Sequence, residues 1–117
     1  MTQTDAALLR QAHDLIKDKG AHLQHEFARD DWGYVVLPMD ARAVKFCAIG
    51  ALMHVTHRKG EADAHKLARL SARGLVTRYF NMTIKELAAV NDLEGHEAVL
   101  DRFARAIMRA DQEAATA

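Results

Sequence analysis

The chain contains a single cysteine and has no net charge, and each of these features excludes a class of protein. Because Cys47 has no second cysteine to pair with, no intramolecular disulfide forms, which suits a reducing compartment. Acidic and basic residues number 16 each, so the bulk positive charge that attracts nucleic acid without specificity is absent. With 50% hydrophobic residues, the chain also lacks the composition of a disordered protein.

Long apolar segments are absent as well. Residues 1–5 carry neither the basic nor the apolar segment of a secretory signal peptide. The longest apolar run is far shorter than the roughly 20 residues that a membrane span requires. We therefore expect a cytoplasmic protein that does not enter the membrane.

The residues that are present suffice for a hydrophobic core. A chain of 117 residues buries roughly two-thirds of its unfolded surface, so it needs neither a metal nor a disulfide to fold. The sequence shows no internal repeat and no linker that would divide it. We expect a single small helical domain over 1–117, with a frayed tail at about 111–117.

The segment 44–55 indicates the centre of that core. Only two of its residues, Lys45 and His54, are polar, so a helix here would be apolar almost all the way round, as buried helices are. We place this central helix at about 41–57. Gly50 in its interior costs about 1 kcal/mol relative to alanine, which makes sense where another segment approaches the backbone closely.

The whole pattern predicts a mainly α fold, with four to five helices packed around the central helix and one short β-hairpin at about 25–37. The hairpin would pair His25–Arg29 with Tyr34–Leu37 across the turn Asp30–Gly33. Caps, glycines and apolar spacing predict these helix limits: Thr4 to Lys19, Asp40 to His57, Glu61 to Arg73 before Gly74, Thr83 to Val90, and Gly95 to Arg109. The pattern over 75–81 is poorly defined. The residues expected to form the core are Leu8, Leu15, Val44, Phe46, Cys47, Leu52, Val55, Leu67, Leu87, Leu100, Phe103 and Ile107.

Residues 47–52 (Cys-Ala-Ile-Gly-Ala-Leu) and the later pair Asn91-Asp92 resemble the motif of a family of uncharacterised small proteins from bacteria and their phages. That family combines a Cys-Ala-x-Gly-Ala-Leu helix, matched by residues 47–52, with a later Asn-Asp pair. Val90 stands where the family often has tryptophan. The likeness spans about 27–107 and implies a shared fold, but no activity, because the family has no assigned function. The residues of this structural motif are Cys47, Gly50, Asn91 and Asp92.

Two features of the motif region could carry catalysis, and each has a plainer interpretation. A reactive thiol needs exposure and a neighbouring cation or helix N-terminus, whereas the neighbours of Cys47 are apolar, which indicates a small buried hydrophobe. Asp92 and His96 could act as a base and its orienting partner. Because no nucleophile, phosphate loop or second carboxylate stands at a telling spacing, we interpret Asn91 and Asp92 as structural turn residues.

The seven histidines could hold a metal ion. His54 and His57 share a helix face, and His22 and His25 repeat their spacing, which suits zinc or nickel if a third ligand is near. However, the sequence has no His-Glu-x-x-His and no Cys-x-x-Cys, and helix ends attract histidine through the helix dipole. His54 and His57 are therefore weak candidates, and we expect no metal and no cofactor.

Two basic stripes suggest an alternative function. One comprises Lys66, Arg69 and Arg73, and the other includes Arg102 and Arg105. Stripes with this helical spacing can follow phosphates, which makes a nucleic-acid-binding module the alternative. Bases also gather at helix ends because they compensate the dipole, without any ligand.

The predicted hairpin offers the best candidates for binding. Alternate side chains of a short hairpin face outward, which selects Trp32, Tyr34 and Val36. Such an aromatic edge could contact another protein or a second copy of the chain, or it could cover the helical core. We favour a small accessory or interaction protein without catalytic activity over the nucleic-acid-binding module, and place a metal- or cysteine-dependent enzyme third.

Overall fold

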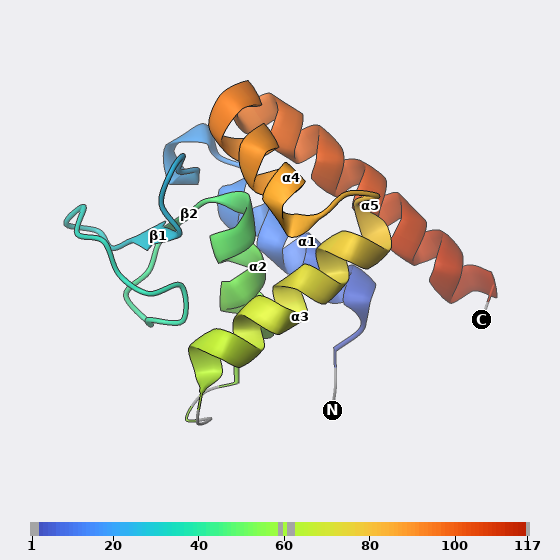
Figure 1. Cartoon of the computed structure of the whole chain (residues 1–117), viewed down its shortest axis with the longest axis horizontal. Helices are drawn as coiled ribbons and strands as arrows, with labels where there is room; N and C mark the ends of the chain where they lie inside the picture. Colours follow the sequence, from blue (N-terminus) through green and yellow to red (C-terminus); the bar gives the residue numbers. More distant parts are fainter. Residues whose placement is uncertain (1–2, 59, 61–62, 117) are drawn as a thin grey trace.

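The computed structural model describes residues 3–58, 60 and 63–116 (Figure 1). Within the described residues, two short strands and two short helical turns accompany the α-helices: β1 (Ala28–Arg29), β2 (Lys45–Phe46), the 3-10 turn η1 (Lys19–Ala21) and the π-helical turn η2 (Val90–Glu94). Within the described residues the α-helices are α1 (Asp5–Ile16), α2 (Ala48–Thr56), α3 (Ala64–Tyr79), α4 (Ile84–Ala89) and α5 (His96–Thr116). The expected mainly α fold with one small antiparallel hairpin is confirmed.

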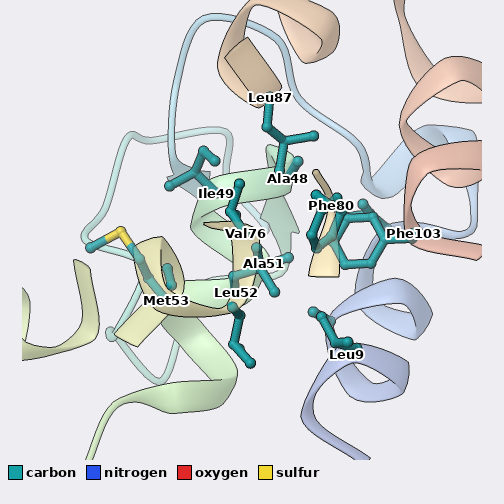
Figure 2. Packing of buried hydrophobic residues seen from close by; sticks show 14 of the residues in the cluster. Leu9, Ala48, Ile49, Ala51, Leu52, Met53, Val76, Phe80, Leu87 and Phe103 are labelled. Carbon is teal, nitrogen blue, oxygen red and sulfur yellow. The ribbon is translucent and has the colours of Figure 1, made fainter. Parts of the chain in front are cut away.

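Helix α2 lies at the centre, as the sequence predicts, and α1, α3 and α4 pack against it (Figure 1). Every residue from 48 to 53 is buried. Phe80 and Phe103 meet edge to face, with their ring centroids 5.0 Å apart. Figure 2 shows large side chains from the surrounding segments that pack in this core: Leu9, Val76, Phe80, Leu87 and Phe103.

Most of the predicted core residues are at least partly buried. Val44 and Leu67 are exceptions, with exposed fractions of 41% and 39%. The buried members of the predicted set are Phe46, Cys47, Leu52, Leu87 and Phe103. Those that are partly buried against the core are Leu8, Leu15, Val55, Leu100 and Ile107.

The start of the central helix differs from the prediction. Helix α2 begins at Ala48 rather than after Asp40, because Lys45 and Phe46 extend to pair with β1. The Asp40 carboxylate instead accepts a hydrogen bond from the Arg42 N–H at 2.8 Å, which closes a turn. An apolar run of this length is compatible with either a strand or a buried helix, so the pattern alone could not place the boundary.

The hairpin also has a different second strand. β1 pairs antiparallel with β2, with Ala28 opposite Phe46, so the strands are joined by a long loop rather than by the turn at residues 30–33. The expected pairing with 34–37 is reduced to one bridge, between Arg29 and Val35. Residues 30–44 therefore form an extended loop beside the helices (Figure 1).

Three other helix ends need correction. Helix α3 continues through Gly74 to Tyr79, because residues 75, 76 and 79 bury their side chains in the core. Its expected start at residue 61 lies outside the described residues. Helix α5 continues to Thr116, so the tail from 111 is helical rather than frayed. Helix α1 ends at Ile16, before the expected limit.

The predicted helix caps at the starts of α1 and α4 are confirmed. The Thr4 hydroxyl accepts a hydrogen bond from the Ala7 N–H at 3.2 Å and so begins α1. Thr83 and Glu86 form the reciprocal capping box that begins α4. In the part of the chain that the structure describes, no helix is both long enough and apolar enough to cross a membrane.

Candidate functional site

The extended loop carries the most exposed aromatic side chain of the described residues. We call residues 31–37 the apolar loop. Trp32 is 86% exposed and Tyr34 is 71% exposed, and neither is covered by the helices. Val35 and Leu37 are also exposed, at 63% and 59%. Large apolar side chains gathered in one segment are typical of a binding surface rather than of scattered surface residues.

Asp30 holds the first half of this loop. Its side chain is buried, and Oδ1 accepts hydrogen bonds from the N–H groups of Trp32 and Tyr34, each at 2.9 Å. The Gly33 N–H donates to the Asp30 carbonyl oxygen at 3.1 Å. Gly33 has a φ of 83°, a conformation that glycine adopts without strain. One buried carboxylate therefore fixes the backbone beneath both aromatic residues.

Further contacts fix the base of the loop. The Arg29 guanidinium donates to the Gly33 carbonyl oxygen and to the Glu26 carboxylate. The hydrogen bond from Arg29 lowers the pKa of Glu26 below its usual value. At the far end, the buried Pro38 accepts a hydrogen bond at its carbonyl oxygen from His54 Nδ1, at 2.6 Å. The apolar loop is thus held at both ends.

The sequence selected two of the exposed residues and misplaced the third. Trp32 and Tyr34 are exposed as predicted, whereas Val36 is partly buried against the core. Its N–H donates to the Ala28 carbonyl oxygen at 3.2 Å, which draws it toward the strands. Strict strand alternation does not predict the exposure of Val35 and Leu37, because this segment forms one β-bridge rather than a strand.

A second candidate site surrounds Asn91, which η2 places at the start of α2. Asn91 is 1% exposed, and its Oδ1 accepts hydrogen bonds from the Ala48 N–H at 2.9 Å and from His22 Nε2 at 2.7 Å. Its Nδ2 donates to the Leu23 carbonyl oxygen at 2.9 Å. The N–H of Ala48 is one of the donors that an α-helix leaves without an internal partner. Asn91 therefore supplies a partner for the first turn of the central helix.

Cys47 completes the cap on that turn. Its Sγ accepts a hydrogen bond from the Gly50 N–H at 3.2 Å, and burial raises the pKa of its thiol to about 11. The two halves of the motif found in the sequence, 47–52 and the Asn-Asp pair, thus meet at one place. A thiol in this environment is held protonated at neutral pH, which opposes a role as a nucleophile.

Asp92 joins the same cluster to the segment before β1. Its Oδ1 accepts hydrogen bonds from the His25 N–H at 2.7 Å and from Asn91 Nδ2 at 2.9 Å. Burial raises the pKa of Asp92, but these two hydrogen bonds, together with the nearby His25 and His22, outweigh it and lower the pKa overall. The structure does not join Asp92 to His96, whose Nε2 lies 2.7 Å from the Ile16 carbonyl oxygen instead.

Three of the seven histidines, His54, His57 and His96, contact backbone carbonyl oxygens. His54 and His57 lie side by side, with ring centroids 5.5 Å apart, but each Nδ1 contacts a backbone carbonyl oxygen, at 2.6 and 2.5 Å. His22 and His96 lie 5.2 Å apart at the edge of a cavity of about 450 Å³. Among residues 3–58, 60 and 63–116, no three histidine, cysteine or acidic side chains form a group that could hold a metal ion.

The two basic stripes are separate in the structure. Lys66, Arg69 and Arg73 line one groove between α3 and the start of α4. Arg102 is partly buried on α5, and Arg105 forms an ion pair with Asp101 at 3.2 Å. The predicted five-residue nucleic-acid-binding set is therefore divided, and its α3 part lines this groove.

The chain belongs to a family of unknown function, DUF6197, whose model matches residues 1–109. The match covers both candidate sites and confirms the expectation of an uncharacterised domain. No curated protein and no solved structure matches the chain.

Proposed function

We propose that this member of a family of unknown function is a non-catalytic interaction protein that binds another protein through its apolar loop. The observation that carries the proposal is the 86% exposure of Trp32 on a segment whose backbone is fixed by a buried carboxylate. Tryptophan and tyrosine are the residues that most often supply binding energy at protein interfaces. Trp32 and Tyr34 are the anchors of this surface.

The fixed backbone supports this assignment. Ordering a flexible loop on binding costs free energy, whereas a loop that already has its bound conformation avoids that cost. Asp30 holds the two aromatic residues from below, and Pro38 holds the end of the loop against α2 through His54. An apolar segment serving only as a cover for the core would bury these side chains rather than expose them.

The size of the loop favours a concave partner. A flat interface of standard size buries roughly 800 Å² on each side and uses about 20–30 residues. The apolar loop has seven residues, too few for such a symmetric contact, but a protruding segment of this length fills a groove. We infer that the partner is a different protein with an apolar groove, rather than a second copy of the chain.

The surroundings of the polar clusters support a non-catalytic role. The Cys47 thiol is buried and its pKa is raised to about 11. The amide of Asn91 is occupied by four partners, at Ala48, His22, Leu23 and Asp92. These groups satisfy backbone donors and acceptors, and so they serve the fold.

The test compares two double variants that each replace two exposed apolar side chains with serine. Trp32→Ser/Tyr34→Ser alters the apolar loop, while Leu93→Ser/Met108→Ser alters exposed residues elsewhere, of which Leu93 is 82% exposed. Each protein is immobilised and used to capture partners from a lysate of the source organism, and each is measured by light scattering and thermal unfolding.

We expect one protein to be retained by the wild type and by the control, and lost by the loop variant, with all three proteins equally folded. Reconstitution of the complex from purified components then confirms a direct contact. Retention of the same proteins by the loop variant contradicts the proposal. A dimer that dissociates in the loop variant would instead assign the loop to self-association.

A further inference from the structure

A groove between α3 and the start of α4 concentrates positive charge. It encloses about 560 Å³. Its walls combine four cations, two threonines and two aliphatic residues and no acidic residue: Lys66, Arg69, Arg73, Lys85, Thr77, Thr83, Leu70 and Ile84. We call this the basic groove. In a chain with no net charge, such a grouping needs an explanation of its own.

The two arginines of the basic groove differ from most other arginines of the chain in their partners. Most arginines elsewhere are engaged in ion pairs, for example Arg10 with Asp111 and Arg42 with Asp40. Among the described residues, no ion pair involves Lys66, Arg69, Arg73 or Lys85. Their charge is therefore available to an external anion.

The acid nearest in sequence does not neutralise them through a direct contact. Glu86 follows Lys85 on α4, but its carboxylate accepts a hydrogen bond from the Thr83 N–H at 3.1 Å as part of the capping box. The Thr83 hydroxyl accepts from the Glu86 N–H and keeps its own proton for donation to a ligand. The capping box thus stabilises the start of α4, which forms one wall of the groove, and keeps the Glu86 carboxylate bonded to the first turn of that helix.

The spacing of the cations indicates an extended anion. Lys66, Arg69 and Arg73 stand at positions i, i+3 and i+7 of α3, so they share a face over about 10 Å of helix axis, at 1.5 Å per residue. Lys85 adds a charge from the other wall. A row of this length exceeds one phosphate group and suits successive phosphates of a polymer.

We propose that the basic groove binds the sugar-phosphate backbone of duplex nucleic acid without reading its sequence. Phosphate contacts from arginine, lysine and threonine position a protein on a duplex but carry no direct sequence information. Proteins that bind single strands generally stack bases on aromatic side chains, and the basic groove has none. This site is independent of the apolar loop and does not rest on the proposed function.

The test measures binding of a fluorescent 20-base-pair duplex by anisotropy at several salt concentrations. Arg69→Gln/Arg73→Gln removes two charges from the basic groove, and Arg102→Gln/Arg105→Gln removes two from α5 as the matched control. Four phosphate contacts predict a slope of log K against log salt of about −3 to −4. We expect the groove variant to bind at least tenfold more weakly with a slope shallower by about 2, and the control to stay within about twofold of the wild type.

Three results would overturn the assignment. Undetectable duplex binding by the wild type at low salt would remove the site altogether. An equal loss in both variants would show a dependence on total charge rather than on the basic groove. Tighter binding of a 20-base single strand or of inorganic polyphosphate, measured in parallel, would assign the groove to another anion.

Discussion

Gly50 lies against the backbone of Phe27 so closely that a Cβ atom on Gly50 would stand 1.9 Å from the Phe27 carbonyl oxygen. The same carbonyl oxygen accepts a hydrogen bond from the Cys47 N–H at 3.2 Å. The segment before β1 is therefore hydrogen-bonded to the start of α2, and its backbone fills the space that a side chain at residue 50 would need. This contact confirms the sequence-based expectation that another segment approaches Gly50.

Replacing Gly50 with alanine should destabilise the protein severely. The added methyl group would meet backbone atoms rather than the flexible end of a side chain, so the two segments would have to separate. We expect the free energy of unfolding to fall by about 3 kcal/mol, the upper part of the range for overpacked cores. Urea unfolding followed by circular dichroism measures this change.

Gly74→Ala provides the matched control. Gly74 lies within α3 and has open space at its Cβ position. Alanine there should raise the stability by about 0.5–1 kcal/mol, because it restricts the unfolded chain and favours the helix. If both substitutions shift the unfolding midpoint in the same direction, close approach is not the reason for glycine at residue 50.

The features that the sequence predicted are those with a local or strongly periodic origin. The capping box at Thr83 and Glu86 involves neighbours only three residues apart, and the apolar run identifies α2 as the central helix. The start of α2 was missed because it depends on the pairing of Phe46 with Ala28, which lies far away in the chain. Tertiary contacts of this kind override local preference.

The remaining errors have the same origin. Gly74 predicts a helix end, but α3 passes through it since Tyr79 and its neighbours are buried. The last turns of α5 carry Glu113, which accepts hydrogen bonds from Arg78 and from the Tyr79 hydroxyl. For the candidate site, the exposed aromatics Trp32 and Tyr34 could be predicted, and the turn at residues 30–33 includes Asp30, whereas the burial of the Asp30 carboxylate has no local signature.

Removing the side chain of Asn91 should cost more than removing an exposed partner of the same cluster. Asn91→Ala leaves the buried Ala48 N–H and the partly buried Leu23 carbonyl oxygen without their bonds. Each such group costs about 1–3 kcal/mol, so we expect a loss of about 3 kcal/mol or more in the free energy of unfolding. Thermal and urea unfolding give the value.

Gln24→Ala is the comparison for that variant. Gln24 is exposed and donates to the backbone carbonyl oxygens of Asn91 and Asp92 at 3.2 and 3.3 Å. Water can replace these bonds, and we expect a loss below about 1 kcal/mol. A loss for Asn91→Ala no larger than that for Gln24→Ala would be inconsistent with the capping role of Asn91.

Cys47 should behave as a helix cap and not as a reactive thiol. Cys47→Ser keeps a side-chain acceptor for the Gly50 N–H, whereas Cys47→Ala removes it. We expect the serine variant to be more stable than the alanine variant by about 1 kcal/mol, the usual contribution of an N-cap.

In the wild type, a thiol reagent at pH 7 should modify Cys47 only after denaturant is added, because burial raises its pKa to about 11. Rapid modification of the native protein, or equal stability of the two variants, would contradict this role.

The imidazole of His22 links the stability of the Asn91 cluster to pH. Burial lowers the pKa of His22 and the neighbouring His96 lowers it further, while the hydrogen bond to Asn91 opposes both effects. When pH falls below about 6.5, the ordinary pKa of histidine, the unfolded chain therefore binds a proton before the folded chain does. His22 thus contributes stability that is present above the unfolded pKa and is lost as pH falls through the folded pKa.

Replacing His22 with glutamine should reduce the loss of stability on acidification. Glutamine offers an N–H donor to Asn91 Oδ1 in place of His22 Nε2, and it does not titrate. We expect the free energy of unfolding to fall less for His22→Gln than for the wild type between pH 7.5 and pH 5. The difference should be smaller than the roughly 1.4 kcal/mol per pH unit that one full proton gives, because His22 is only partly buried. Urea unfolding at the two pH values measures it, and the histidines remote from His22 cancel since they are common to both proteins. Parallel pH profiles would show that His22 has the same pKa in the folded and unfolded chains, and a steeper profile for His22→Gln would reverse the sign of the linkage.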